Sequence, residues 1–532
     1  MRAKSIILTA AALTLMIAGL VPVLGLFVSS LFSHGRPGYL YFERFADSTQ
    51  PWLLLARSFT LAGLTTLIAL LLGIPLGILL GKSNIPFRRC LAFLFTIPLV
   101  IPPYILAVLW FYLLGRSGLA GRIFGPWVAE HTAGWLFGLP GCVLVLSSVM
   151  LPVVMLLMIV LLKTVNPRLE EAGRTVSGWP RVLRGITIPL ILPGILLSAI
   201  LVFLLSFGEF GVPMFLRFDV FPVEAFTRFT AFLDQGAAAA ATYPLIFVTL
   251  VLLTVEHVYL CNRTYALRPL TGAHSHLDIE LGKTRGWAFF VVVALCLLLV
   301  LLPISILLWE ALSGGAIGEA IIRARDSLMR SLAYAALGAT LLTTAGFLLG
   351  YLIHNRALRI WKSIDSLSVF LFALPSTVIG IGMVTAWNHP ATGFIYGTPA
   401  ILLLGYLAQY SAIASRISVS TLAQMPAGME EAAQAAGAGW LRRFERIVVP
   451  LSWKGIVGAW LISFIFCLRD TGISMMVYPP GRDTLPVRIF TLMANGSTGL
   501  ISSLCLLMCL ATMVPLVLGG IFLYYQGREQ EI

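Results

Sequence analysis

Long apolar segments alternate with short polar ones along the whole chain. A helix crosses a hydrocarbon core of roughly 30 Å with about 20 residues, because each residue adds roughly 1.5 Å. The first half predicts spans at about 5–32, 57–81, 90–114, 138–162, 189–216 and 239–261, and the second half at about 287–312, 331–353, 366–387, 399–420, 451–477 and 499–525. Many contain Gly and Pro, which membrane helices tolerate. The pattern predicts an all-α, polytopic membrane protein with about 12 transmembrane helices.

Composition agrees with this class. Of the 532 residues, 59% are hydrophobic and 11% are charged, whereas soluble domains carry about 25% charged residues. Disorder is excluded as well, because it requires low hydrophobicity. The seven cysteines form no Cys-x-x-Cys pair and lie mostly in apolar runs, so we expect small buried side chains rather than disulfides or a zinc site.

The first apolar segment could be read as a signal peptide. Arg2 and Lys4 precede it, but the stretch from Ile6 to Phe32 is longer than the 7–15 residues of a signal-peptide core. No clear small-residue cleavage site follows. We therefore expect an uncleaved first helix with a cytoplasmic N-terminus.

The net charge of +13 raises the question of nucleic acid, which basic proteins often bind. With a cytoplasmic N-terminus, 23 of the 36 basic residues lie in cytoplasmic segments, 12 lie in outer segments, and Arg469 lies within a span. Cytoplasmic loops of membrane proteins carry this bias. The excess charge thus indicates the topology of a multi-pass membrane protein with both termini cytoplasmic, and we expect no nucleic-acid partner.

Ordered landmarks recur in the two halves. Arg57-Ser58 opens the second span and Arg330-Ser331 opens the eighth. Pro98 and Trp110 have counterparts 277 residues later, in Pro375 and Trp387. Five further residues recur at a constant offset of 261: Pro189, Gly194, Phe203, Glu209 and Gly211 match Pro450, Gly455, Phe464, Asp470 and Gly472.

This repeat predicts two tandem units of six spans each. Six is even, so both copies enter the membrane in the same direction, as in parallel repeats. We place the first unit at residues 1–270, a cytoplasmic linker at 271–286, and the second unit at 287–532.

Two cytoplasmic loops, 163–189 and 421–450, are long and match each other. The first contains Glu170-Glu171-Ala172-Gly173 and Gly178, and the second contains Glu430-Glu431-Ala432-Ala433 and Gly437. Each predicts a short helix with acidic residues in its first turns, where the helix dipole favours them. Asn166-Pro167 suits the start of the first helix. A glycine in the left-handed conformation can end each helix: Gly178 in the first copy, Gly437 or Gly439 in the second.

The simpler interpretation of one such loop is an amphipathic helix at the membrane surface that has no protein partner. Two copies at the same place in a duplicated protein favour a docking element instead. The loops resemble the EAA loop of ABC importer permeases. The second copy fits in full, from Glu431-Ala432-Ala433 through Gly437 to Pro450. The first departs, because Gly173 replaces the second alanine, the loop is one residue shorter, and Ser177 or Gly178 occupies the glycine region.

The resemblance implies that each half is a permease unit of the type I ABC importer fold. Each short helix would then be a coupling helix seated on one subunit of a cytoplasmic ABC ATPase dimer, with a periplasmic or extracellular solute-binding protein on the other side. The residues that would couple to the ATPase are Glu170, Glu171, Ala172, Gly173, Gly178, Glu430, Glu431, Ala432, Ala433 and Gly437.

Segments of the second half resemble the fused permeases of ferric-iron importers. They are Leu468-Arg469-Asp470-Thr471-Gly472, Tyr478-Pro479-Pro480-Gly481 and Thr484-Leu485-Pro486-Val487-Arg488. The resemblance implies transport of a small solute, with ferric iron as the first candidate. Related permeases handle thiamine, polyamines, sulfate or phosphonates, so these substrates stay open.

No nucleotide site is predicted in the chain. A P-loop needs Gly-x-x-x-x-Gly-Lys-Ser/Thr after a strand. The segment from Gly77 to Ser83 is one residue too short and ends a membrane helix, and Gly282-Lys283-Thr284 lacks the upstream glycine. We expect no catalytic residues, no enzyme activity and no cofactor in this chain, with ATP and Mg²⁺ bound by the partner ATPase.

Glu209, Arg469 and Asp470 carry charge where the pattern predicts membrane. Such charges usually face a cavity or one another. They could line the translocation path or form a gate, or they could lie near the outer surface and satisfy backbone groups or water. A carboxylate can contact a metal, but the resemblance implies that the binding protein holds the ion, so no metal site is predicted. An ion-coupled secondary transporter with a six-plus-six repeat is the distant alternative.

Overall fold

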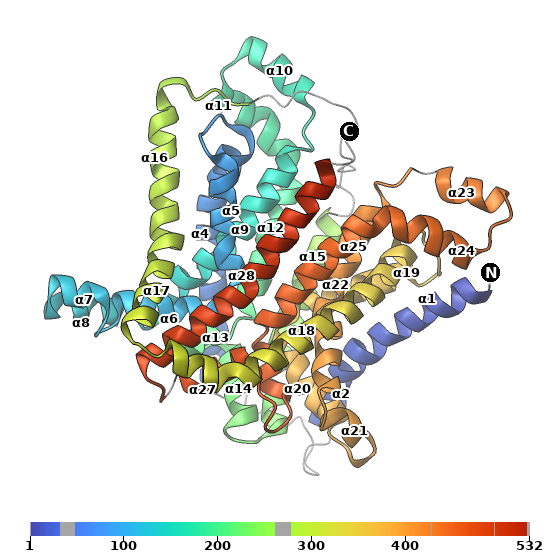
Figure 1. Ribbon diagram of the computed structural model, residues 1–532. Helices are drawn as coiled ribbons and strands as arrows, with labels where there is room; N and C mark the ends of the chain where they lie inside the picture. The colour runs from blue at the N-terminus through green and yellow to red at the C-terminus, as the bar shows by residue number, and fades with distance from the viewer. Residues whose placement is uncertain (1, 32–47, 261–277, 427, 494, 529–532) are drawn as a thin grey trace. The chain divides into compact units, whose positions relative to one another are not determined.

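The computed structural model describes residues 2–31, 48–260, 278–426, 428–493 and 495–528. Within these ranges the chain folds into helices, and the extended pairing found there is one isolated parallel bridge between Ser83 and Ile279 (Figure 1). Eleven described helices are long and apolar enough to cross a membrane, or twelve if the bent pair Trp361–Ala373 and Ser376–Trp387 is one span. The prediction of an all-α polytopic membrane protein is confirmed.

The helices form two compact units, each of which combines segments from both sequence halves. The first-half unit holds residues 49–223 and 247–310, and the second-half unit holds residues 1–48, 224–246 and 311–532. The tandem boundaries at residues 270 and 287 follow the order of the repeat and stay a prediction. Of the linker at 271–286, residues 271–277 lie outside the described residues.

The first-half unit follows the predicted order of spans. Its helices are α4 (Gln50–Lys82), α5 (Arg88–Val100), α6 (Pro103–Leu114), α7 (Leu119–Phe124), α8 (Pro126–Leu136), α9 (Leu139–Leu162), α10 (Pro167–Val176), α11 (Trp179–Val182), α12 (Ile188–Phe207) and α13 (Gly211–Phe215). Helices α14 (Phe221–Thr230), α15 (Gln235–Leu260) and α17 (Leu302–Ser313) continue from one unit into the other, and α16 (Arg285–Cys296) lies in the first-half unit.

The second-half unit repeats that order. Its helices are α1 (Arg2–Leu15), α2 (Val21–Leu31), α18 (Ile317–His354), α19 (Trp361–Ala373), α20 (Ser376–Trp387), α21 (Gly393–Tyr396), α22 (Ala400–Leu422), α23 (Gly428–Ala435), α24 (Trp440–Arg443), α25 (Val449–Arg469), α26 (Gly472–Val477), α27 (Leu485–Leu492) and α28 (Thr498–Arg528). π-Helical segments precede the fifth span of each half at the repeat offset of 261, namely η3 (Leu183–Thr187) and η7 (Phe444–Val448).

The opening span of each sequence half packs in the unit of the other half. Gly19, between α1 and α2, lies so close to α19 that an added Cβ would meet Leu371. In the first-half unit, Val292 and Cys296 of α16 share a buried cluster with Leu91 and Phe95 of α5. The repeat pattern describes sequence order, so it could not predict this exchange.

Two details of the predicted spans are wrong. The first is the match of Pro98 with Pro375. Pro98 lies inside α5, and the break in the third span is at Ile101-Pro102, whereas Pro375 lies in the break of the ninth span, between α19 and α20. Pro102, which is 273 residues before Pro375, has nearly the same backbone angles and is therefore its structural counterpart. The fifth and eleventh spans also end early, at Phe207 and Arg469, because a new short helix begins beyond each.

Candidate functional site

The first coupling loop forms the predicted helix α10. Asn166 caps it, since its side chain accepts a hydrogen bond from Arg168 N at 3.1 Å, and Pro167 takes the first helical position. Glu170 is fully buried. Its carboxylate accepts a hydrogen bond from Thr187 Oγ1 at 2.7 Å and pairs with Lys82 Nζ at the end of α4. Glu170 therefore fastens α10 to the rest of its unit.

The next two residues of the motif face away from the rest of the unit. Glu171 and Ala172 are exposed. Leu169 and Val176, at the two ends of α10, expose 48% and 87% of their surface. The helix thus offers an outward surface of mixed apolar and acidic character, while its inward face is fixed by an ion pair.

Gly173, the departure from the motif, has a structural reason. A Cβ at this position would lie 2.7 Å from Ile186 Cδ1 and 3.1 Å from Val182 Cγ2. Both are closer than ordinary van der Waals contact. Glycine lets α10 approach the segment that follows it more closely than alanine would.

The predicted left-handed conformation at Gly178 is wrong. Gly178 has a φ of −73° and begins α11, and the residue that ends α10 is Ser177, which is extended with a φ of −149°. Ser177 N donates to Gly173 O at 2.9 Å. The shorter first loop has no residue to spare for a left-handed turn, so the chain passes directly into the next helix.

The second coupling loop ends its helix as predicted at Gly437. Gly437 has a φ of +82°, and Ala438 N donates to Ala433 O at 3.0 Å across the turn. Gly439 has a φ of −62° and begins α24. It is the counterpart of Gly178, 261 residues later, which settles the register of the two loops.

Glu430 fastens α23 as Glu170 fastens α10, with different partners. Its carboxylate accepts a hydrogen bond from Tyr351 Oη of α18 at 2.7 Å and lies 4.0 Å from Arg443. Trp440 Nε1 donates to the same Tyr351 oxygen at 3.1 Å. Lys4 of α1 lies over the Tyr351 ring, 5.3 Å from its centroid. Glu431 and Ala432 are exposed and Ala433 is half-buried, as their counterparts are in the first loop.

Glu209 and Asp470 hold equivalent places after the fifth span of each half. Gly211 N donates to Glu209 Oε1 at 3.0 Å at the start of α13. Asp470 is buried and accepts hydrogen bonds from Ser474 N, Ser474 Oγ and Tyr410 Oη, each at 2.8 Å. The bonds from Gly211 N and Ser474 N agree with the interpretation in which the carboxylates satisfy backbone groups.

Arg469 is half-buried, and its guanidinium lies 4.6 Å from the centroid of the Phe466 ring. The role of Glu209, Arg469 and Asp470 in a path or gate stays a prediction. Among the described residues, no three His, Cys, Asp or Glu side chains are grouped so as to hold a metal ion.

A pair of contacts that the sequence did not predict lies at the other end of the second span in each half. In the first half, Arg57 pairs with Asp219 at 3.3 Å, and Ser58 Oγ accepts a hydrogen bond from Phe221 N at 3.0 Å. In the second half, Arg330 pairs with Asp483 at 2.6 Å. We call each arrangement a distal clamp, since it lies at the end of the span away from the coupling loop.

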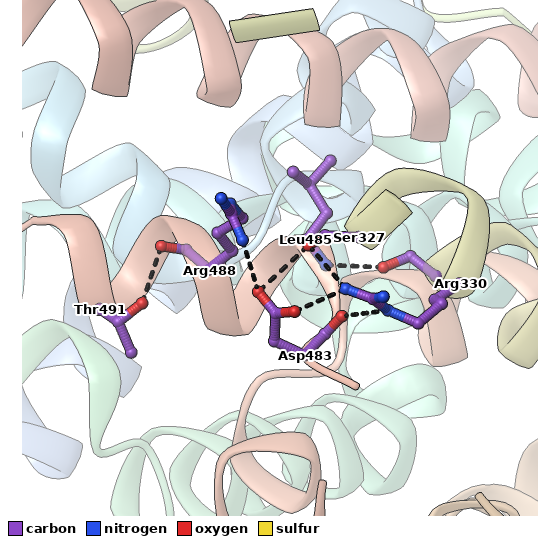
Figure 2. Close-up of polar contacts among 7 residues, drawn as sticks. Ser327, Arg330, Asp483, Leu485, Arg488 and Thr491 are labelled. Carbon is purple, nitrogen blue, oxygen red and sulfur yellow. Dashed lines mark hydrogen bonds and ion pairs between the residues drawn. The ribbon is translucent and has the colours of Figure 1, made fainter. Parts of the chain in front are cut away.

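The second clamp is the more elaborate. Leu485 N donates to Ser331 Oγ at 2.7 Å, and Arg488 and Ser327 also donate to Asp483, at 3.2 and 3.1 Å. Figure 2 shows Asp483 between Arg330 and Arg488. The Asp483 side chain is 23% exposed, whereas that of Asp219 is 72% exposed. The recurring Arg-Ser dipeptide was the signal, but its partners lie more than 150 residues away in sequence.

Comparison with known proteins identifies the class. The family described as binding-protein-dependent transport system inner membrane component matches residues 73–259 and again residues 343–528. The chain belongs to this family. Each matched segment includes one coupling loop and one half of a distal clamp, and both begin within the second span of their half, beyond Arg57 and Arg330.

Several transport permeases are similar to this chain. The ferric transport permease FbpB 1 of Haemophilus influenzae is 24% identical over 500 residues, covering 88% of this chain and 77% of the relative. The ferric transport system permease FbpB of Actinobacillus pleuropneumoniae is 24% identical over 417 residues, covering 73% and 59%. The molybdenum transport permease ModB of Escherichia coli is 33% identical over 161 residues, covering 30% and 69%. The chain is therefore a duplicated permease of a binding-protein-dependent importer.

Proposed function

We propose that this permease carries ferric iron across the bacterial inner membrane, powered by a separate dimer of ABC ATPase subunits. The observation that carries the proposal is the pair of coupling helices. In each, the first glutamate is bonded inward to the second span, and the second glutamate is exposed beside small residues. Such a helix is fixed to the permease and still free to seat in a partner.

The outward faces supply the docking surface. Leu169 and Val176 of α10 and Met429 of α23 are exposed apolar residues beside the exposed acids. Apolar anchors surrounded by polar residues are typical of protein interfaces. The two ATPase subunits would each hold one helix, and their closure on ATP would move both. ATP and Mg²⁺ would be bound by that partner.

Orientation follows from the same assignment. If α10 and α23 face the ATPase, both coupling loops are cytoplasmic. With twelve spans, where the bent pair α19 and α20 counts as one, both termini lie on that side as well. The basic residues that follow the two helices, such as Arg181 and Arg442, are exposed on this side, in agreement with the positive-inside bias. A solute-binding protein would dock on the opposite face, near the distal clamps.

Ferric iron is proposed because the two relatives that cover most of this chain carry that name. The molybdenum permease is more identical but covers 30% of this chain, and a phosphonate permease of Salmonella typhimurium covers 40%. The iron would be cargo that the binding protein delivers. Glu209, Arg469 and Asp470 would shape the path or gate at the distal ends of α12 and α25.

The test uses proteoliposomes that contain the permease and its ATPase. Uptake of radioactive iron from an Fe³⁺-loaded binding protein is expected to require ATP inside the vesicle and to continue after ionophores collapse the ion gradients. Uptake of molybdate or phosphonate in place of iron would contradict the assignment of ferric iron as the substrate. Uptake that follows the ion gradient without ATP would contradict the importer class and favour a secondary transporter.

A further inference from the structure

In each half, one helix touches both functional ends of its unit. Helix α4 carries Arg57 and Ser58 of the distal clamp near its start and ends at Lys82, which pairs with Glu170. From Ser58 to Lys82 is about 36 Å along the helix axis at 1.5 Å per residue, which exceeds a hydrocarbon core of roughly 30 Å. Helix α18 does the same with Ser331 and Tyr351, about 30 Å apart.

These helices are held along their length by glycine pairs. Gly73 and Gly77 of α4 face α9, and Gly346 and Gly350 of α18 face α22, at the same offset of 273 that relates Arg57 to Arg330. A Cβ on Gly73 would lie 2.7 Å from Val154 Cβ. Glycines four apart let membrane helices approach closely. Since α9 and α22 lead directly into α10 and α23, each second span is packed against the helix that carries its coupling loop.

At its distal end, the second span of each half binds a backbone N–H group as well as a carboxylate. Ser58 and Ser331 accept from the first N–H of α14 and of α27, respectively. These helices follow the short helices α13 and α26, which begin beside Glu209 and Asp470. A change in the tilt of the second span would thus displace the segment next to those two carboxylates.

We propose that the second span of each half is a strut that transmits motion between the coupling helix and the distal segment. Arg57, Ser58, Arg330 and Ser331 are its positioning residues. The inference rests on the proposed function of α10 and α23. Closely packed interiors have low compressibility and shift between discrete arrangements, so a displacement of Glu170 or Glu430 moves the whole strut. The linkage is reciprocal, so docking of the binding protein at the distal face would change the position of the coupling helices on the ATPase.

The two struts differ in strength at the distal end. Asp483 accepts from Arg330, Arg488 and Ser327, whereas Asp219 is largely exposed and pairs with Arg57. The first clamp is therefore the better place for a test, because it can be reversed in sign by exchanging two residues.

The experiment measures ATP hydrolysis by the intact permease–ATPase complex in proteoliposomes, with and without loaded binding protein. Arg57→Asp is expected to retain the ATPase and the basal rate of hydrolysis but to lose at least fivefold of the stimulation by binding protein. The exchange Arg57→Asp with Asp219→Arg is expected to recover at least half of it. Recovery is expected to be incomplete because the exchange still removes the contact between the Arg57 guanidinium and the Phe218 ring, whose centroid lies 5.9 Å away. The matched control is Thr60→Val, because Thr60 is exposed on α4 and its hydroxyl donates to Ala56 O within the helix.

If the Arg57→Asp permease does not assemble with the ATPase, a milder variant tests the strut. Ser58→Ala with Ser331→Ala removes both acceptors and keeps every charge, and is expected to lower stimulation at least threefold at an unchanged basal rate. Full stimulation in this variant, or no recovery in the exchange variant, would overturn the strut. If the unaltered complex shows no ATP-dependent uptake, the proposed function fails and the strut fails with it. If that complex transports and the clamp variants match it, the strut alone is wrong.

Discussion

Glu170 and Lys82, 88 residues apart in sequence, form an ion pair inside the protein at the inner face of the first coupling helix. The Glu170 side chain is 1% exposed and that of Lys82 is 10% exposed. Carboxylates are rarely buried unless they are paired. The pair, with the hydrogen bond from Thr187, fixes the position of α10 and leaves Glu171 free to face a partner.

Lys82→Ala is predicted to destabilise the permease strongly. It leaves the Glu170 carboxylate buried without its cation, and breaking a buried pair costs about 3–5 kcal/mol. Lys82→Met with Glu170→Gln removes both charges and is expected to recover most of that loss. Thermal unfolding of the purified protein in detergent measures both variants. Glu171→Gln is the exposed control, and an equally large loss in that variant would mean that the buried pair is not what matters.

Tyr351→Phe is predicted to loosen the second coupling helix. The change removes a hydroxyl that donates to Glu430 and accepts from Trp440, and leaving a buried polar group unsatisfied costs about 1–3 kcal/mol. We expect faster hydrogen exchange in α23 than in the unaltered protein, with α10 unchanged. Equal exchange in α23 before and after the substitution would show that Tyr351 does not hold this helix.

The two loop glycines are predicted to respond differently to alanine. Gly437 has a φ of +82°, which costs an L-residue about 1–2 kcal/mol. Gly178 has a φ of −73°, and the nearest atom to an added Cβ is Pro180 Cδ at 3.8 Å. Gly437→Ala should therefore weaken ATPase binding several-fold, whereas Gly178→Ala should not. Binding of the purified ATPase to permease in nanodiscs compares them, and equal affinities would contradict the assigned conformations.

Glycines of α4 provide a second matched pair. A Cβ on Gly77 would collide with Met158 Cβ of α9, whereas nothing lies within 4 Å of a Cβ on Gly63. Gly77→Val is predicted to separate α4 from α9 and to lower both the melting temperature and uptake. Gly63→Val should leave both within error. A tolerated Gly77→Val would show that close packing of the second and fourth spans is not required.

Patterns that depend on local chemistry were predictable from the sequence. The spans follow from hydropathy, and the helix starts at Asn166-Pro167 and stop at Gly437 follow from backbone preferences. The orientation of the coupling helices, in contrast, depends on tertiary contact. No local rule says that Glu170 rather than Glu171 turns inward, because the choice rests on Lys82, which arrives from another helix.

The same holds for the distal clamps and the exchanged first spans. Arg57-Ser58 and Arg330-Ser331 were visible as a repeat, but a repeat reveals equivalence and not partners. Asp470 looked like a charge within a span because the apolar run continues past it. The short helix α26, in which Ser474 N donates to Asp470, could not be told from the membrane helix by hydropathy alone.

The most direct test of the central assignment is co-purification of the ATPase with a permease altered in its second coupling loop. Glu431→Lys with Gly437→Pro reverses an exposed charge and blocks the left-handed turn, while the bonds of Glu430 inside the protein remain. We predict that the folded variant loses both the ATPase and ATP-dependent uptake. A variant that keeps both would contradict the assignment of α10 and α23 as coupling helices.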